Sequence, residues 1–228
     1  MTYRNTFFNA FTILLVICGI AGLTPAADQV QSMEQSTIKS YMATENTILK
    51  KRVLQTLSEG FNSEVDVAEH WKVDFLRDVL KERSPVLVEA AAHQIGALLI
   101  KDLNADLITL FHTAEQKYMG YSERVQIALV QTLGKTGGNE AVKLFSDFLN
   151  TDNGSYLGYE VLAAIAELNN PVLVTNLHAY AEKMKKRIAE CKAQNKDPIF
   201  YSKFRRLKNL ATDTENSLLR VKEGGDEK

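Results

Sequence analysis

The sequence contains few of the residues that interrupt helices or cross-link chains. It has 4 prolines, 12 glycines and 2 cysteines among 228 residues, and clusters of β-branched residues are rare. This scarcity excludes a turn-rich β fold and favours helix. The length and a hydrophobic content of 45% are enough for one domain, or one short repeat array, with a real core.

A strong charge of either sign is also missing. The formal net charge is −1, so no global field draws the chain to nucleic acid or to an acidic membrane. Charged residues make up 24% of the chain, which is ordinary for a folded soluble protein. We therefore expect no nucleic-acid partner.

The longest apolar run lies at the N-terminus. Arg4 precedes an almost wholly apolar stretch at 7–23, and small residues follow it. This order is typical of a secretory signal that is cut after Ala26 or Ala27. We interpret 1–27 as a signal peptide and expect an exported protein, periplasmic or extracellular. The alternative is an uncleaved membrane anchor, although 17 residues fall short of the roughly 20 that span a bilayer.

The two cysteines lie far apart and have separate interpretations. Cys18 resembles the lipidated cysteine of bacterial lipoproteins, but Ile17 is bulky where that motif has a small residue. Lipidation of Cys18 is therefore the second reading, and it would attach the chain to a membrane through its N-terminus. Cleavage after Ala27 leaves Cys191 alone, so no internal disulfide forms and stability has to come from packing. We read Cys191 as an idle thiol, with an intermolecular disulfide as the alternative.

Apolar residues recur at helical spacing through most of the mature chain. Ser84, Ser122, Asn139 and Asn170 can cap helices, and Gly134 is expected to end one before a turn at Gly137-Gly138. The predicted helices cover 41–58, 65–81, 84–100, 105–119, 122–134, 139–150, 155–168, 170–192 and 199–221. The expected organisation is a signal peptide at 1–27, a polar segment at 28–44, a repeat domain at 45–192, a C-terminal helix at 193–222 and a disordered tail at 223–228.

Equivalent positions of the helix pairs recur at a regular interval. The residues that follow the last large apolar position of each first helix are Ser58, Gly96, Gly134 and Ala166, at steps of 38, 38 and 32. Two helices per period of this size are typical of a helical solenoid. Neither helix of the best-formed pair, within 122–150, buries its apolar stripe alone, so each needs neighbours.

The sequence resembles the HEAT-repeat family over 45–192. The resemblance is carried by Val88-x-Ala90-Ala91-x3-Ile95-Gly96, by Val125-x2-Ala128-Leu129-x3-Leu133-Gly134, and by Gly137-x3-Ala141-Val142-x-Leu144. Arg52 and Glu160 depart from the pattern, in the first and last units. The resemblance implies an all-α fold, a short right-handed α-solenoid of about four HEAT-like helix pairs plus a C-terminal helix. A tetratricopeptide array, whose period is 34, ranks second because its Trp-Leu-Gly-Tyr pattern is absent, and a compact helical bundle ranks third.

No motif in the sequence indicates catalysis or metal binding. The four histidines, at 70, 93, 112 and 178, do not have ligand spacing. Gly134-Lys135-Thr136 matches the end of a phosphate-binding loop, but Leu129 stands where that motif needs its first glycine. Ser155 lacks the context of a nucleophile elbow. We expect a protein that is not an enzyme and that has no cofactor and no metal.

Solenoids bind partners along an extended face, which the family resemblance implies the second helices line. We therefore predict a protein partner and a non-catalytic scaffold. The alternatives are a membrane-anchored structural or assembly subunit of an envelope complex and, after it, an enzyme accessory. Basic clusters at 183–187 and 203–208 are read as solvated helix faces, with an anionic-lipid patch as the alternative. The predicted partner face consists of Asp106, Thr109, His112, Gln116, Lys143, Ser146, Asp147, Thr175 and His178.

Overall fold

The computed structural model describes residues 36, 39, 42–59, 62, 70–152 and 154–225. The predicted signal peptide at 1–27, with Cys18, lies outside the described residues, and so does most of the polar segment at 28–44. Export, cleavage and lipidation therefore stay predictions.

The chain divides into two compact units, 1–53 and 54–228. Helix α3 (Thr47–Thr56) spans the boundary and is shorter than the helix predicted for 41–58. Its start is fixed by Asn46, whose side-chain oxygen accepts hydrogen bonds from the backbone N–H groups of Ile48 and Leu49 at 3.0 and 3.2 Å. This is the usual way to satisfy the free N–H groups of a first turn.

The second unit is built from helices throughout its described part. The helices are α4 (His70–Leu80), α5 (Pro85–Ala97), α6 (Asn104–Lys117), α7 (Ser122–Thr136), α8 (Asn139–Thr151), α9 (Leu157–Leu168), α10 (Val174–Ala193) and α11 (Pro198–Gly225), with 3-10 turns η1 (Lys101–Leu103) and η2 (Pro171–Leu173). The described residues contain no strand, so the all-α prediction is confirmed for them.

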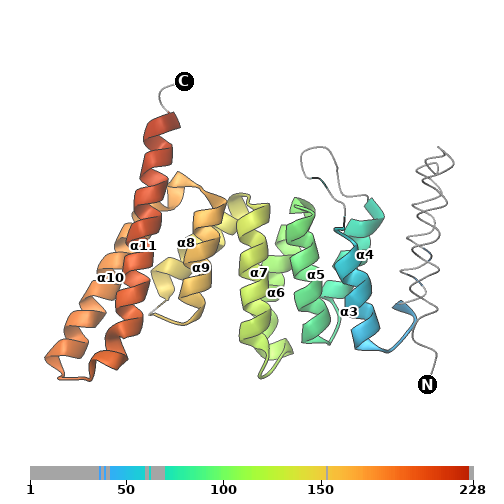
Figure 1. Cartoon of the computed structure of the whole chain (residues 1–228), viewed down its shortest axis with the longest axis horizontal. Coiled ribbons are helices and arrows are strands. Elements are labelled where there is room, and N and C mark those ends of the chain that lie inside the picture. The colour runs from blue at the N-terminus through green and yellow to red at the C-terminus, as the bar shows by residue number, and fades with distance from the viewer. Residues whose placement is uncertain are drawn as a thin grey trace, which may run out of the picture. The chain divides into compact units, whose positions relative to one another are not determined.

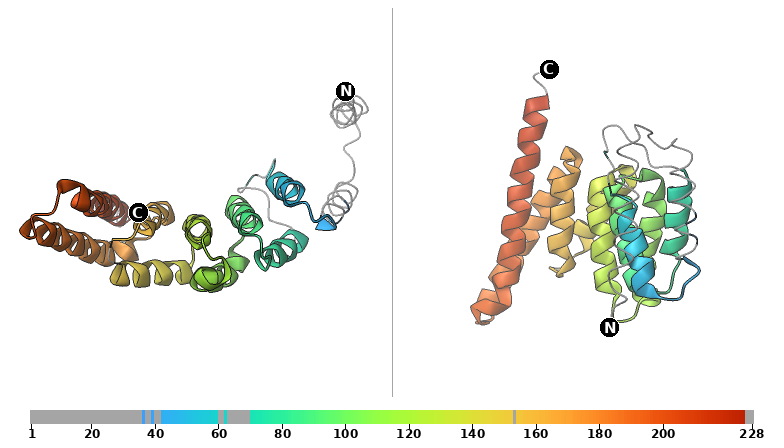
Figure 2. Two further views of the ribbon diagram at one scale, coloured as in Figure 1. Left: turned by 90° about the horizontal axis from the view of Figure 1, so that it is seen from below. Right: turned by 45° about the vertical axis from the view of Figure 1, so that its right-hand side comes forward.

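Helices of the second unit lie in two rows, and chain order alternates between the rows. Within the first row α5 packs on α7, α7 on α9 and α9 on α11, while the second row consists of α4, α6, α8 and α10 (Figures 1 and 2). Between the rows, α7 packs mainly against α6, which precedes it, rather than against α8, which follows it. The best-formed predicted unit therefore buries its stripes chiefly against neighbouring units.

Those apolar stripes form the core of the unit. Val125, Ala128, Leu129 and Leu133 of α7 are buried, as are Leu144, Phe145 and Leu149 of α8. Burying one such Leu or Phe side chain contributes roughly 1.5–3 kcal/mol. Phe148, which the spacing places on the same stripe, is only half-buried.

Several helix ends differ from the predictions. Helix α7 continues through Gly134 to Thr136, and the chain turns at Gly137, whose φ of 70° favours glycine. Ser84, Ser122 and Asn139 make no side-chain cap, whereas Asn170 accepts a hydrogen bond from the N–H of Val172 at 3.0 Å. Helix α11 extends to Gly225, into the tail predicted at 223–228, of which 226–228 lie outside the described residues.

The segment 101–104, predicted as a break between helices, is itself helical. The 3-10 turn η1 leads directly into α6, so Asn104 is the first residue of that helix. The Asn104 side chain is buried and donates a hydrogen bond to the carbonyl of Gly137 at 2.7 Å. This hydrogen bond joins the start of α6, in the second row, to the turn that follows α7, in the first row.

Candidate functional site

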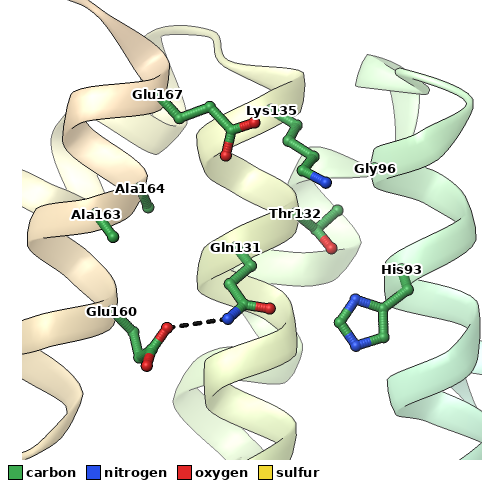
Figure 3. A pocket seen from close by; sticks show the side chains of 9 residues that line it. All are labelled: His93, Gly96, Gln131, Thr132, Lys135, Glu160, Ala163, Ala164 and Glu167. Atoms are coloured by element: carbon green, nitrogen blue, oxygen red, sulfur yellow. Dashed lines mark hydrogen bonds between the residues drawn. The ribbon is translucent and has the colours of Figure 1, made fainter.

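A hollow of about 360 Å³ opens in the first row between α5, α7 and α9 (Figure 3). Three successive helices of one row contribute to it. Its lining consists of His93, Gly96, Gln131, Thr132, Lys135, Glu160, Ala163, Ala164 and Glu167.

The floor of the hollow is made of small residues because α7 and α9 lie very close together. A Cβ atom added to Gly134 would lie 2.9 Å from the Cα, Cβ and carbonyl oxygen of Ala164. No larger residue fits there without moving backbone. At Gly96 of α5 the corresponding distance is 3.4 Å, to a flexible atom of Lys135, so space remains on that side.

The walls of the hollow are polar. Gln131 donates a hydrogen bond to a carboxylate oxygen of Glu160 at 2.9 Å, which links α7 to α9. Figure 3 shows Glu167 pointing toward α7, Lys135 pointing toward α5, and His93 pointing from α5 toward α7 at the level of Gln131. Two carboxylates, an ammonium, an amide and an imidazole thus face one space, and they offer donors and acceptors to a ligand with backbone amides or charged side chains.

Beneath the hollow runs a buried set of hydrogen bonds. The hydroxyl of Thr132 lies 2.7 Å from the carbonyl of Ala92 on α5 and 2.8 Å from that of Ala128 on α7, and its single proton serves these acceptors. One turn later, the hydroxyl of Thr136 donates to the side-chain oxygen of Asn104 at 2.7 Å. The sequence places Thr132 on an apolar stripe and gives no sign of the acceptors at Ala92 and Asn104, since these come from other helices.

The predicted partner face is divided among α6, α8 and α10. Asp106 accepts a hydrogen bond from Arg77 of α4 at 3.3 Å. Ser146 accepts one from Asn176 at 2.9 Å, and a ring nitrogen of His178 lies 3.1 Å from a carboxylate oxygen of Glu215. The other predicted residues on these helices are exposed: Thr109, His112, Gln116, Lys143, Asp147 and Thr175.

Asp106 and Thr109 of the predicted face line a second hollow together. This second hollow, of about 250 Å³, lies between α4 and α6 in the second row. The Thr109 hydroxyl donates to the carbonyl of Ala105 in its own helix at 2.9 Å. Whether the predicted residues contact a partner stays a prediction.

A further polar cluster connects α8 to α10. The Tyr180 hydroxyl donates to Asp152 at 2.6 Å, and the N–H groups of Gly154 and Ser155 donate to the same carboxylate at 3.0 Å each. Burial opposes ionisation of Asp152, but these hydrogen bonds outweigh it and lower its pKa. Burial, and then the adjacent Asp152, raise the pKa of Tyr180 far above its usual value. The cluster holds a turn in place, and nothing in the sequence pattern indicates it.

Two lysines donate hydrogen bonds to free carbonyl groups at the C-terminal ends of second-row helices. Lys183 donates to the carbonyls of Leu149 and Asn150 at 3.0 and 2.8 Å, at the end of α8. Lys117 donates in the same way to Leu80 and Lys81, at 3.3 and 3.2 Å, at the end of α4. A lysine in this position complements the negative end of the helix dipole. Burial lowers the pKa of both lysines.

Other candidate sites of the sequence do not form. Within the described ranges, no three His, Cys, Asp or Glu side chains are grouped so that they can hold a metal ion. The Gly134-Lys135-Thr136 segment lies inside the last turns of α7, where it is helix rather than a phosphate loop. Cys191 is a free, buried thiol. None of the helices that the structure describes has the length and apolar character to cross a membrane.

Comparisons of the chain with protein-family models, with curated proteins and with solved structures find no match. The function has to be inferred from the arrangement of residues alone. Of the features above, the hollow between α5, α7 and α9 is the one that can receive a ligand across several helices.

Proposed function

We propose that this chain is an exported HEAT-like helical solenoid that acts as a non-catalytic protein-interaction scaffold. We further propose that a segment of the partner protein lies in the first-row hollow. The alternation of helices between two rows supports the solenoid, because each helix packs on the helix two places away in the chain.

Recurring side-chain contacts give further support for repeated units. In the second row, Arg77 and Asp106 join α4 to α6, and Ser146 and Asn176 join α8 to α10. The lysine contacts at the ends of α4 and α8 recur at the same two junctions. Similar contacts at corresponding junctions are expected when one helix pair is repeated along a chain.

The single observation that carries the binding proposal is the hollow itself. It has the size of a small ligand site, and its lining comes from three successive helices. A peptide segment that crosses the row can place side chains between α7 and α9 over the Ala163–Ala164 floor. Its polar groups then meet Gln131, Lys135 and Glu167.

Site-specific photo-cross-linking in intact cells tests this proposal. A photoreactive residue replaces exposed Ala163 in the hollow, and a matched variant carries it at exposed Lys143 on the predicted second-row face. We expect a discrete cross-linked protein from position 163 that is lost when Glu167→Lys is added. Cross-links from position 143 alone would support the predicted second-row face and contradict binding of the partner in the hollow. Cross-links from neither position would count against an interaction scaffold.

Export is tested separately by the mass of the mature protein. We expect an N-terminus produced by a cut after Ala26 or Ala27. A lipid-modified Cys18, or an uncut chain in the membrane fraction, would favour the anchored subunit instead. A full-length product in the cytoplasm would reject export.

A further inference from the structure

The strongest charge asymmetry of the chain lies in the α10–α11 hairpin. Ten basic and two acidic residues lie between Lys183 and Lys208, which gives this stretch a formal charge of +8 in a chain whose net charge is −1. Neither the core nor the proposed function of the first-row hollow requires this concentration.

The fold brings the two basic clusters of the hairpin together. Helices α10 and α11 pack against each other along their length, and they run in opposite directions (Figure 1). Near the turn, the Lys192 ammonium lies 6.0 Å from the centre of the Tyr201 ring. Because the helices are antiparallel, residues that precede Lys192 lie beside residues that follow Tyr201. Residues 185–187 of α10 are therefore at the same level as residues 206–208 of α11. The clusters, which are separate in sequence, therefore lie at the same level of the hairpin.

Few acidic groups neutralise these clusters. Glu182 is paired with Lys185 at 3.1 Å and Glu190 with Arg187 at 3.2 Å, and Asp197 accepts a hydrogen bond from the N–H of Ile199 at 2.9 Å. Among the described residues, no carboxylate lies within ion-pair distance of Lys192, Arg205 or Arg206, and these three are exposed. Such cations attract a surface of opposite charge.

Apolar side chains accompany the cations at the same end of the unit. Ile199, in the first turn of α11, is 72% exposed, and Met119 in the α6–α7 connection is 85% exposed. Figure 1 shows the α6–α7 connection and the α10–α11 turn at the lower end of the helices of this unit. Cations beside exposed aliphatic side chains fit the boundary between lipid headgroups and acyl chains better than a nucleic acid, which offers phosphate without an apolar layer.

We propose that the tip of the α10–α11 hairpin docks on an anionic membrane surface, with its cations on lipid phosphates and Ile199 inserted among the headgroups. This contact is separate from the first-row hollow and from any attachment through the N-terminus.

Vesicle flotation of the full chain tests the electrostatic part. The measured quantity is the ratio of binding to vesicles with phosphatidylglycerol and to vesicles of phosphatidylcholine alone, because the apolar N-terminal segment contributes to both. We expect the triple variant Lys192→Glu, Arg205→Glu, Arg206→Glu to lower binding to the anionic vesicles on the order of 100-fold. An unchanged ratio in this variant would overturn the proposal. So would stronger competition by duplex DNA than by the vesicles at equal phosphate concentration.

Tryptophan fluorescence tests the insertion of the tip. The only tryptophan is removed by Trp71→Phe, and a new one is introduced by Ile199→Trp or, in the matched control, by Val172→Trp. Val172 is 71% exposed and belongs to η2, between α9 and α10 at the other end of the unit. With brominated phosphatidylglycerol we expect quenching for Ile199→Trp and none for Val172→Trp. Equal quenching of both, or of neither, would overturn the proposal, provided circular dichroism shows that the variants are folded.

Discussion

At the α7–α9 junction the helices touch through Gly134 and Ala164, whereas at the α5–α7 junction they are joined by the Thr132 hydroxyl and the carbonyl of Ala92. Both junctions belong to the same row, and Gly96 and Gly134 occupy corresponding places in the repeat. The α7–α9 junction tolerates no added atom at Gly134, although Gln131 and Glu160 also form a hydrogen bond across it, while the α5–α7 junction contains a buried hydrogen bond and accommodates a methyl group at Gly96. The hollow lies where these two kinds of junction meet.

The largest effect is expected from Gly134→Ala. Alanine is favoured over glycine inside a helix by about 1 kcal/mol, but the new methyl group would lie 2.9 Å from backbone atoms of Ala164. We expect a net loss of about 2 kcal/mol in the free energy of unfolding, measured by urea denaturation, because α7 and α9 must separate. The matched variant Gly96→Ala meets its nearest atom at 3.4 Å, an ordinary contact distance, so the helix preference for alanine is not opposed and we expect a gain of up to about 1 kcal/mol. Equal losses in both variants would show that the two junctions do not differ.

The next effect concerns a hydrogen bond in the second row. Tyr180→Phe removes the donor to ionised Asp152, and we expect a loss of about 1.5 kcal/mol in the free energy of unfolding at pH 7. The folded-state pKa of Asp152 is lowered, so its stabilisation is complete above the unfolded pKa of about 4 and disappears as the pH falls through the folded pKa. The difference between Tyr180→Phe and the unaltered chain should therefore shrink below about pH 4. A difference that stays constant down to acid denaturation would contradict this account.

A smaller loss is expected from Thr132→Val at the α5–α7 junction. Valine has nearly the same shape, so this substitution removes the hydrogen bond to Ala92 without opening a cavity. We expect a loss of about 1 kcal/mol in thermal or urea unfolding. Thr136→Val is the comparison. The Thr136 hydroxyl donates to Asn104 of α6, in the second row, and not to a neighbouring helix of the first row. A Thr132→Val variant as stable as the unaltered chain would mean that shape alone sets this junction too.

The smallest effect on stability is expected from Gln131→Ala. Gln131 and Glu160 are only partly buried, so losing their hydrogen bond should change the free energy of unfolding by less than about 0.5 kcal/mol. Cross-linking of a partner from position 163 should nevertheless fall, because the amide lines the hollow. Unchanged cross-linking would show that the partner does not bind the Gln131 amide.

The fold could be predicted from the sequence to the extent that apolar spacing determines it. In α7 the apolar residues recur at helical spacing, so they share one face of the helix and are buried together. They are Val125, Ala128, Leu129 and Leu133. Gly134 shows the limit of such reasoning. Its position suggests a helix end, yet α7 continues through it to Thr136. A glycine is required there for another reason: Ala164, a residue 30 positions away, lies too close for a side chain.

The hollow could not be predicted for the same reason. Its lining comes from α5, α7 and α9, and each residue alone has an ordinary helical setting. Polar residues on the second helices, such as Lys143 and Asp147, are recognisable in the sequence because they stand opposite an apolar stripe. Spacing within one helix identifies an exposed face, but a cavity depends on how far apart the neighbouring helices lie.

The central place of α7 also bears on how the protein opens. This helix packs against α5, α6 and α9, so its amide hydrogens become accessible only after neighbours on both sides have moved away. In a row held by contacts between adjacent helices, opening begins at the ends and travels inward. Native-state hydrogen exchange should therefore be slowest in α7, faster in α5 and faster again in α4, so that α7 is the last of these three helices to lose protection.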